Sequence, residues 1–166
     1  LHNEPVTVRE NECAVIEQAF EKGYVKPGSP FVRTGKRVAV IGSGPAGLAV
    51  ADRLNRLGHK VTVYEARDAA GGLLRYGIPD FKLQKSVIDR RLEIMEAGGI
   101  CFRVNNAVGK DIEGAEIYNY YDAVCLATGA MIPRDLAVPG RNLSGIHFAL
   151  DFLMQQNKMI RGIKVP

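Results

Sequence analysis

Three glycines at the spacing G-x-G-x-x-G, Gly42, Gly44 and Gly47, limit the possible folds of this chain more than any other feature. They follow an apolar run at residues 38–41, which predicts a short buried strand, and they begin a helical pattern over residues 45–58. In this setting Gly42 permits a tight turn, Gly44 lets the backbone approach a pyrophosphate, and Gly47 lets the helix pack on the strand. The motif therefore predicts a dinucleotide site, rather than an ordinary strand-turn-helix.

Strands and helices alternate along the rest of the chain. Thr7 and Glu10 match a capping box at the start of a first helix, which Gly23 would end. Further predicted strands cover residues 61–64, 100–104 and 123–127, and further predicted helices cover residues 84–97 and 146–156. This order predicts an α/β fold, a Rossmann-like parallel sheet with flanking helices, preceded by a short helical segment.

Composition excludes several other functions. The net charge of +4 comes from Lys and Arg scattered among acids, which disfavours nucleic acid as a partner. No apolar run approaches the roughly 20 residues of a membrane span. Cys13, Cys101 and Cys125 are far apart and form no C-x-x-C pair, so they are interpreted as small apolar residues of a reduced protein, and no metal site is expected.

The nucleotide is indicated by residues that follow the glycine motif. Glu65 ends the second predicted strand about 20 residues on, where an acid accepts hydrogen bonds from a free ribose hydroxyl; this favours NAD or FAD over NADP. Gly71 and Gly72 then predict a loop whose backbone passes close to another group, although a flexible turn is the alternative. The stretch "GGLLRYGIP" predicts a rigid segment of small residues, whereas a simple dehydrogenase would begin a helix at this point. With the strand end "LATGA" at residues 126–130, this order of features favours FAD.

Longer segments carry a more specific resemblance. They are "NEPVTV", "AFEKGYVKP", "RTGKRVAVIGSGPAGLAVADRLNRLGHKVTVYEA", "GGLLRYGIPDFKL", "VIDRRLEIMEAGGI" and "LATGAMIPRDLAVPGRNLSGIHFALDFL". Together they resemble the small-subunit family of NADPH-dependent glutamate synthases over nearly the whole chain. Related patterns occur in the flavoprotein subunit of ferredoxin:NADP oxidoreductase (sulfide dehydrogenase) and in dihydropyrimidine dehydrogenase.

The resemblance implies a cytoplasmic electron-entry enzyme. In that family NADPH gives hydride to FAD, and electrons leave through two [4Fe–4S] clusters toward the large (alpha) subunit or an equivalent electron acceptor, where glutamate is formed from 2-oxoglutarate and glutamine. No catalytic side chain is required. The alternatives are a flavoprotein with a different acceptor, ferredoxin or a pyrimidine, and a non-catalytic nucleotide-binding or subunit-interaction module.

The family's cofactor-binding residues are expected at matching positions of this sequence. Those at the FAD pyrophosphate are Gly42, Gly44, Pro45, Ala46 and Gly47, with Glu65 at the adenosine ribose. Those beside the flavin are Gly72, Leu73, Leu74, Gly77 and Ile78, with Val108 at the adenine and Thr128 and Gly129 near the pyrophosphate or flavin. Arg67, Arg75 and Arg134 are expected as phosphate or flavin neighbours, with an exposed surface arginine as the alternative for each.

The resemblance also suggests domain limits. Residues 1–35 are expected to be a helical segment and linker from the end of an iron–sulfur domain, with the Pro- and Gly-rich linker at residues 26–35. Residues 36–150 are expected to form the first portion of the FAD-binding domain, and residues 151–166 a connector toward an NADPH-binding domain. The cluster cysteines of the family lie upstream of "NEPVTV" and its second glycine motif lies downstream, so we expect this chain to be a piece of a longer one.

Overall fold

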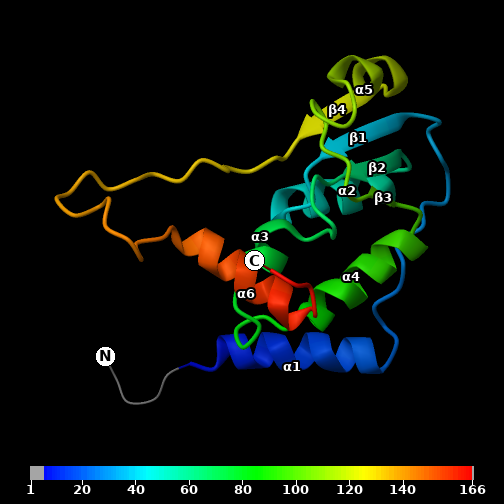
Figure 1. Ribbon diagram of the computed structural model, residues 1–166. Coiled ribbons are helices and arrows are strands. Elements are labelled where there is room, and N and C mark those ends of the chain that lie inside the picture. Colours follow the sequence, from blue (N-terminus) through cyan, green and yellow to red (C-terminus); the bar gives the residue numbers. More distant parts are fainter. Residues whose placement is uncertain (1–5, 166) are drawn as a thin grey trace.

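A four-stranded parallel sheet forms the centre of the computed structural model, which describes residues 6–165 (Figure 1). Its strands are β1 (Arg37–Ile41), β2 (Lys60–Tyr64), β3 (Cys101–Arg103) and β4 (Ala123–Leu126), and they lie in the order β3-β2-β1-β4. All three strand pairs are parallel. The predicted α/β fold with a parallel sheet and flanking helices is confirmed.

Six helices accompany the sheet within residues 6–165: α1 (Val8–Glu21), α2 (Pro45–Arg56), α3 (Gly72–Tyr76), α4 (Lys85–Ala97), α5 (Gly114–Tyr120) and α6 (Ala149–Ile160). Every helix and strand that the sequence predicted is present, with ends shifted by up to four residues. Helices α3 and α5 were not predicted. The expectation of a helix-free path through "GGLLRYGIP" is therefore wrong, because Gly72 opens one short helical turn.

The predicted capping box is also wrong. Thr7 occupies the N-cap position of α1, but its side chain makes no capping hydrogen bond, and Glu10 accepts from the Arg9 guanidinium at 2.9 Å instead. The backbone of Thr7, with φ −85° and ψ 41°, is not in the extended conformation in which a cap side chain reaches the first-turn N–H groups.

The two faces of the sheet are covered unequally. On one face Val40, Val61 and Val63 pack against Ala51 of α2 and Met95 of α4. The opposite face is covered by the small helix α5, whose Ile117 packs on Ala39 and Ile41. The strand register pairs these two residues with Val124 and Leu126 of β4, whose side chains are 38% and 77% exposed. The core is therefore concentrated around β1 and β2, the strands that lead to the glycine loop and to Glu65.

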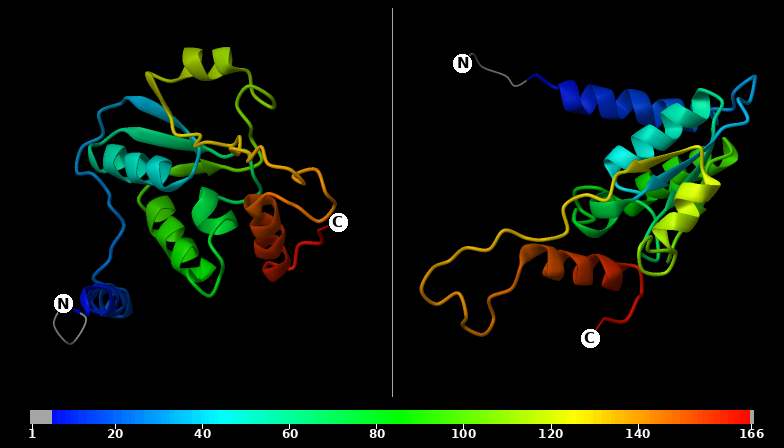
Figure 2. Two further views of the ribbon diagram at one scale, coloured as in Figure 1. Left: turned by 90° about the vertical axis from the view of Figure 1, so that its left-hand side faces the viewer. Right: turned by 90° about the horizontal axis from the view of Figure 1, so that it is seen from above.

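Two segments extend away from this core (Figures 1 and 2). Helix α1 lies apart from the sheet and contacts α4, where Glu17 pairs with Arg90, whose guanidinium also stacks over the Phe20 ring at 4.0 Å. Residues 127–148 leave β4 as a long excursion without helix or strand and return to α6, which packs beside α3. None of the helices described between residues 6 and 165 is long and apolar enough to cross a membrane.

Candidate cofactor-binding site

Two of the three motif glycines are required by the fold itself. Gly42 has a φ of +105°, and a Cβ atom there would lie 2.3 Å from the carbonyl oxygen of Ala127. A Cβ on Gly47 would lie 2.0 Å from the carbonyl oxygen of Gly42. Both distances are far shorter than a carbon–oxygen contact permits, so the tight turn and the close helix–strand packing predicted for these two glycines are confirmed.

Gly44 is different. Apart from Gly44 itself and its two chain neighbours, no atom of the described chain lies within 4 Å of the position that its Cβ would take, and its φ of −67° is open to any residue. Gly44 is the N-cap of α2, Pro45 follows at the first helical position, and the exposed Ala46 and buried Gly47 complete the first turn. The N–H groups of a first helical turn have no carbonyl partner within the helix and attract anions. The backbone at Gly44 is therefore open beside these N–H groups.

The second glycine pair packs directly on the first glycine loop. Gly71 and Gly72 have φ values of +125° and +51°, and a Cβ on Gly72 would lie 2.7 Å from the Cα of Gly44. The close approach predicted for this pair is therefore confirmed, and its neighbour is the backbone of Gly44. The start of α3 is thereby fixed against the start of α2.

A buried serine, which the sequence analysis did not single out, joins these loops to the end of β2. Ser43 is 0% exposed; its hydroxyl donates to Oε2 of Glu65 and accepts from the backbone N–H of Gly71 at 3.0 Å. The Ser43 N–H also donates to Oε2 of Glu65, at 3.2 Å, and the Arg67 N–H donates to Oε1, at 2.9 Å. Glu65 is only 7% exposed, and three donors of the chain itself hold its carboxylate in place.

The residues expected beside a flavin lie on α3 and the turn after it. Leu73 is 42% exposed, and its carbonyl oxygen accepts from the N–H groups of both Gly77 (2.9 Å) and Ile78 (3.0 Å). This bond pattern ends α3 and fixes the turn. Leu74 is half-buried and its carbonyl oxygen faces the ammonium of Lys85.

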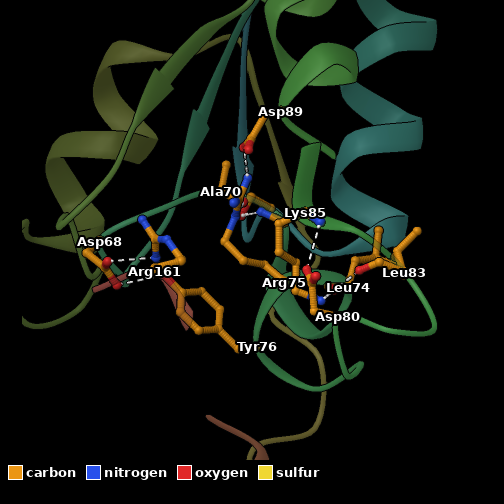
Figure 3. A network of polar contacts seen from close by, with 12 residues as sticks. Asp68, Ala70, Leu74, Arg75, Tyr76, Asp80, Leu83, Lys85, Asp89 and Arg161 are labelled. Atoms are coloured by element: carbon orange, nitrogen blue, oxygen red, sulfur yellow. Dashed lines mark hydrogen bonds and ion pairs between the residues drawn. The ribbon is translucent and has the colours of Figure 1, made fainter. Parts of the chain in front are cut away.

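Arg75 is buried, so the alternative of an exposed surface arginine is wrong for this residue, and its place beside a phosphate or flavin stays a prediction. It is 4% exposed, its Nε donates to the carbonyl oxygen of Ala70 at 2.6 Å, and its guanidinium pairs with Asp89 of α4 (Figure 3). A guanidinium can be buried when carboxylate and carbonyl acceptors satisfy it, and here they lie on the same side of α3. Arg75 therefore ties α3 to α4.

Lys85, also outside the sequence-based expectations, holds the turn that follows α3. Its buried ammonium donates to the carbonyl oxygens of Leu74 (3.3 Å), Ile78 (2.6 Å) and Leu83 (3.0 Å) (Figure 3). Burial lowers the pKa of Lys85, and the charge of Asp80 opposes this effect. Three carbonyl acceptors are the full complement for an ammonium group, so all three donors of Lys85 are used to hold this turn against the end of α3.

On the other side of α3, a polar network attaches α6 (Figure 3). The Tyr76 hydroxyl donates to Asp68 at 2.6 Å, and Arg161 donates to Asp68 at 2.9 Å and to the Tyr76 hydroxyl at 3.2 Å. Burial, together with the hydrogen bond to Asp68, raises the pKa of Tyr76 to about 12. Arg67 also lies over the Tyr76 ring, at 4.8 Å from its centroid, so this expected phosphate neighbour stacks on an aromatic ring in the structure.

Of the remaining residues expected at the cofactor, some lie next to the glycine loop and others do not. Thr128 is adjacent to it, since its Cα would lie 3.2 Å from a Cβ on Gly42, and Gly129 follows with a φ of +71°. Val108 packs in the cluster that contains Ile41, the last residue of β1 before the loop. Arg134 is exposed and lies within the excursion of residues 127–148, where it lines a shallow cavity of 460 Å³ with Phe148.

The arrangement is suited to binding and orienting a cofactor. Three chain segments, the glycine loop, the diglycine turn and the end of β4, meet at the carboxyl ends of β1, β2 and β4, the edge where open parallel sheets bind ligands. Among residues 6–165 there is no group of three or more His, Cys, Asp or Glu side chains arranged to hold a metal ion.

Comparison with known proteins agrees with this geometry. Residues 36–164 match the sequence profile of the family described as pyridine nucleotide-disulphide oxidoreductase. The chain is 48% identical over 153 residues to the glutamate synthase [NADPH] small chain of Bacillus subtilis, which covers 92% of this chain and 31% of that protein. It is 51% identical over 158 residues to glutamate synthase [NADH] of Schizosaccharomyces pombe, covering 94% of this chain and 8% of that protein.

A solved structure extends the likeness to three dimensions. FprA of Mycobacterium tuberculosis in complex with NADPH superposes with a TM-score of 0.67 at 29% identity, over 74% of this chain and 29% of that one. The present chain spans about a third of the length of the glutamate synthase small chains that it matches. The sequence profile, the parallel sheet and the glycine loop lead to one conclusion: the chain belongs to the pyridine nucleotide-disulphide oxidoreductase family.

Proposed function

We propose that this chain is the FAD-binding part of a flavoprotein oxidoreductase. The open space at Gly44 carries the proposal. Gly42 and Gly47 are glycines because the chain's own backbone excludes a side chain, whereas within the described residues no atom excludes one at Gly44. A ligand that approaches the Gly44 backbone supplies the missing reason, and the first-turn N–H groups of α2 indicate that this ligand is an anion.

The proposed cofactor runs across the three loops. Its pyrophosphate lies at Gly42, Gly44, Pro45, Ala46 and Gly47, with Thr128 and Gly129 alongside. Its adenosine lies at Glu65 and Val108, with Arg67 nearby. Its flavin end follows Gly72, Leu73, Leu74, Gly77 and Ile78. The half-exposed Leu73 and the Lys85-bound turn support this last assignment, because they form a firm surface next to Gly44.

The charge of Glu65 favours FAD over NADP at this loop. NADP carries a 2′-phosphate on its adenosine ribose, where NADP sites normally supply an arginine and FAD sites an acid. Two like charges about 4 Å apart cost about 1 kcal/mol in water and about 4 kcal/mol at the dielectric of a protein surface. Arg67 offsets part of this cost, but its guanidinium is stacked on Tyr76. We therefore place NADPH on another domain of the whole protein.

The names of the relatives support a more specific proposal, glutamate synthesis. In it the whole protein is a cytoplasmic glutamate synthase small chain, in which bound flavin takes hydride from NADPH and releases the electrons singly. The electrons pass through [4Fe–4S] clusters to a large-chain partner that forms glutamate from 2-oxoglutarate and glutamine. Residues 1–35 then belong to the end of an iron–sulfur domain, residues 36–150 to the FAD-binding domain, and residues 151–166 to a connector.

A second candidate keeps the flavin and changes the electron acceptor. The chain is also 42% identical over 159 residues to the putative oxidoreductase AegA of Escherichia coli, so similarity of this strength is not confined to proteins named glutamate synthase. The residues near the glycine loop serve either acceptor equally well. The acceptor must therefore be identified by a different experiment from the one that identifies the cofactor.

Both levels of the proposal can be tested on the natural protein at full length. We expect it to purify with one FAD per chain and to show bleaching of the flavin absorbance on anaerobic addition of NADPH. Glutamate formation from glutamine and 2-oxoglutarate, after the large chain is added, would support the specific proposal. NADPH-dependent reduction of ferredoxin without glutamate formation would support the second candidate. A protein that binds no flavin would contradict both and favour a non-catalytic module.

A further inference from the structure

Ser43 stands between two motif glycines, at a position that the G-x-G-x-x-G pattern leaves free. Its side chain is nevertheless completely buried, and its hydroxyl both donates to Glu65 and accepts from Gly71. A small polar side chain with no exposure and two satisfied hydrogen bonds has a specific partner set, which alanine or glycine cannot provide. We propose that Ser43 is a positioning residue, which orients the Glu65 carboxylate so that one oxygen, Oε1, receives the cofactor's adenosine ribose.

Counting acceptor sites shows why one oxygen is selected. An ionised carboxylate offers about four lone-pair sites, two on each oxygen. On Glu65, Oε2 accepts from the Ser43 N–H and the Ser43 hydroxyl, and Oε1 accepts from the Arg67 N–H. Three sites are therefore in use, and the remaining one is on Oε1. A ribose, which has two neighbouring hydroxyl groups, would donate only one strong hydrogen bond to Glu65.

The same hydroxyl also couples the ribose end of the site to its flavin end. The Gly71 N–H donates to Ser43, and the next residue, Gly72, is in backbone contact with Gly44. Because the single proton of the Ser43 hydroxyl goes to Glu65, its lone pair is directed to Gly71. Removal of the hydroxyl leaves the N–H of Gly71 without its acceptor, and it leaves the Glu65 carboxylate held by only two backbone donors, the N–H groups of Ser43 and Arg67, and therefore less firmly oriented.

This inference rests on the proposed function, since it needs FAD at the glycine loop. The test is a double-mutant cycle in the full-length protein, with FAD dissociation constants measured by titration of the deflavinated protein. Ser43→Ala should weaken FAD binding about fivefold, the equivalent of one neutral hydrogen bond. In the Glu65→Ala background the same change should have a clearly smaller effect, because only the hydrogen bond to Gly71 is then left to lose. Ser86→Ala, at an exposed position of α4, is the matched control and should bind like the wild type.

Ribose analogues give a readout that a purely structural role would not change. Wild-type protein should lose affinity for one of the two FAD analogues that lack the 2′- or the 3′-hydroxyl of the adenosine ribose, and keep its affinity for the other. Ser43→Ala should reduce this difference to less than about twofold. If Ser43→Ala fails to fold, Ser43→Cys, which keeps the size and weakens the hydrogen bonds, should reduce the difference in the same direction.

The possible outcomes distinguish a failure of the role of Ser43 from a failure of the proposed FAD binding. Equal losses with both analogues in the wild type, or an equal effect of Ser43→Ala with and without Glu65, would overturn the role of Ser43 and leave FAD binding intact. A wild-type protein that binds neither FAD nor the analogues would overturn the proposed function, and this inference with it.

Discussion

The side chain of Asn157 donates a hydrogen bond to the backbone carbonyl of Tyr76 at 3.0 Å, and this bond joins α6 to α3 across 81 residues of sequence. The same Nδ2 donates to the carbonyl oxygen of Leu153, at 2.9 Å, and Asn157 is only 1% exposed. Helix α3 is thus held by α6 on one side and by Arg75 and Lys85 on the other (Figure 3). The helix that carries the proposed flavin-side residues is therefore fixed from both directions.

Replacement of Asn157 should loosen this attachment. Asn157→Ala removes the donor to Tyr76 and leaves a buried carbonyl without its partner, which costs about 1–3 kcal/mol in free energy of unfolding. Chemical denaturation of the variant should show this loss. Asn119→Ala, on the exposed face of α5, is the matched control and should change stability by less than about 0.5 kcal/mol. Equal stability of the two variants would mean that α6 is not held by this bond.

The attachment of α6 should also weaken in acid. Burial raises the pKa of Asp68, but the hydrogen bond from Tyr76 and the charge of Arg161 outweigh it and hold the pKa below its ordinary value of 3.8. Because the folded protein binds this proton less tightly than the unfolded chain, the stabilisation is complete above the unfolded pKa and is lost as pH falls through the folded pKa. The stability difference between wild type and Asp68→Asn should be constant near neutrality and shrink below about pH 4.

Denaturation curves collected between pH 7 and pH 3 would measure this difference. In an Arg161→Met background, Asp68→Asn should have a smaller pH-dependent effect, because one of the groups that lower the pKa is absent. A wild-type advantage that grows as the pH falls would have the wrong sign and would contradict the assignment.

Lys85 should be needed for the shape of the turn after α3. Lys85→Met keeps most of the side-chain volume but leaves the carbonyl oxygens of Leu74, Ile78 and Leu83 without their donor. We expect a loss of about 2–4 kcal/mol in unfolding free energy and faster amide exchange in residues 74–83. Lys82→Met, on the exposed tip of the same turn, should leave both quantities near wild-type values. Unchanged exchange in Lys85→Met would show that the turn does not depend on the ammonium.

The features that the sequence predicted are those set by local spacing. The apolar runs predicted β1 and β2, and the G-x-G-x-x-G spacing itself predicted the roles of Gly42 and Gly47, although the carbonyl that excludes a side chain at Gly42 belongs to the distant Ala127. Ser43 and Lys85 could not be found in this way. Ser43 meets the Glu65 carboxylate and the Gly71 N–H, and Lys85 meets three carbonyl groups of α3 and the turn after it, only once the chain is folded. Neither residue belongs to a pattern of hydrophobic or glycine spacing.

Arg75 illustrates the same limit. Its position within "GLLRYGIP" suggested a phosphate or flavin neighbour, or a surface residue, but the acceptor that decides its place is Asp89, one helix later. Helix α5 was missed for a different reason. Its seven residues are too short for a clear helical period, and only Ile117 among them is buried.

The glycine loop offers a last prediction, in which two neighbouring glycines should respond in opposite ways. Gly44→Ala should keep its stability within about 0.5 kcal/mol of the wild type, because φ and the surrounding space both allow a Cβ. Its FAD affinity should fall roughly tenfold or more, since the methyl group would occupy the space proposed for the pyrophosphate. Unfolding curves and FAD titrations of the full-length protein would measure both quantities.

Gly42→Ala should instead lower the stability of the folded protein, and it should weaken FAD binding only as a consequence. Its Cβ would lie 2.3 Å from the carbonyl oxygen of Ala127 at a φ of +105°, so the folded state itself should lose about 3 kcal/mol or more, and weaker FAD binding would follow from that loss. Gly23→Ala, at a positive φ but with open space around it, separates backbone strain from this collision. If Gly44→Ala binds FAD as tightly as the wild type, the space at Gly44 is not the pyrophosphate site.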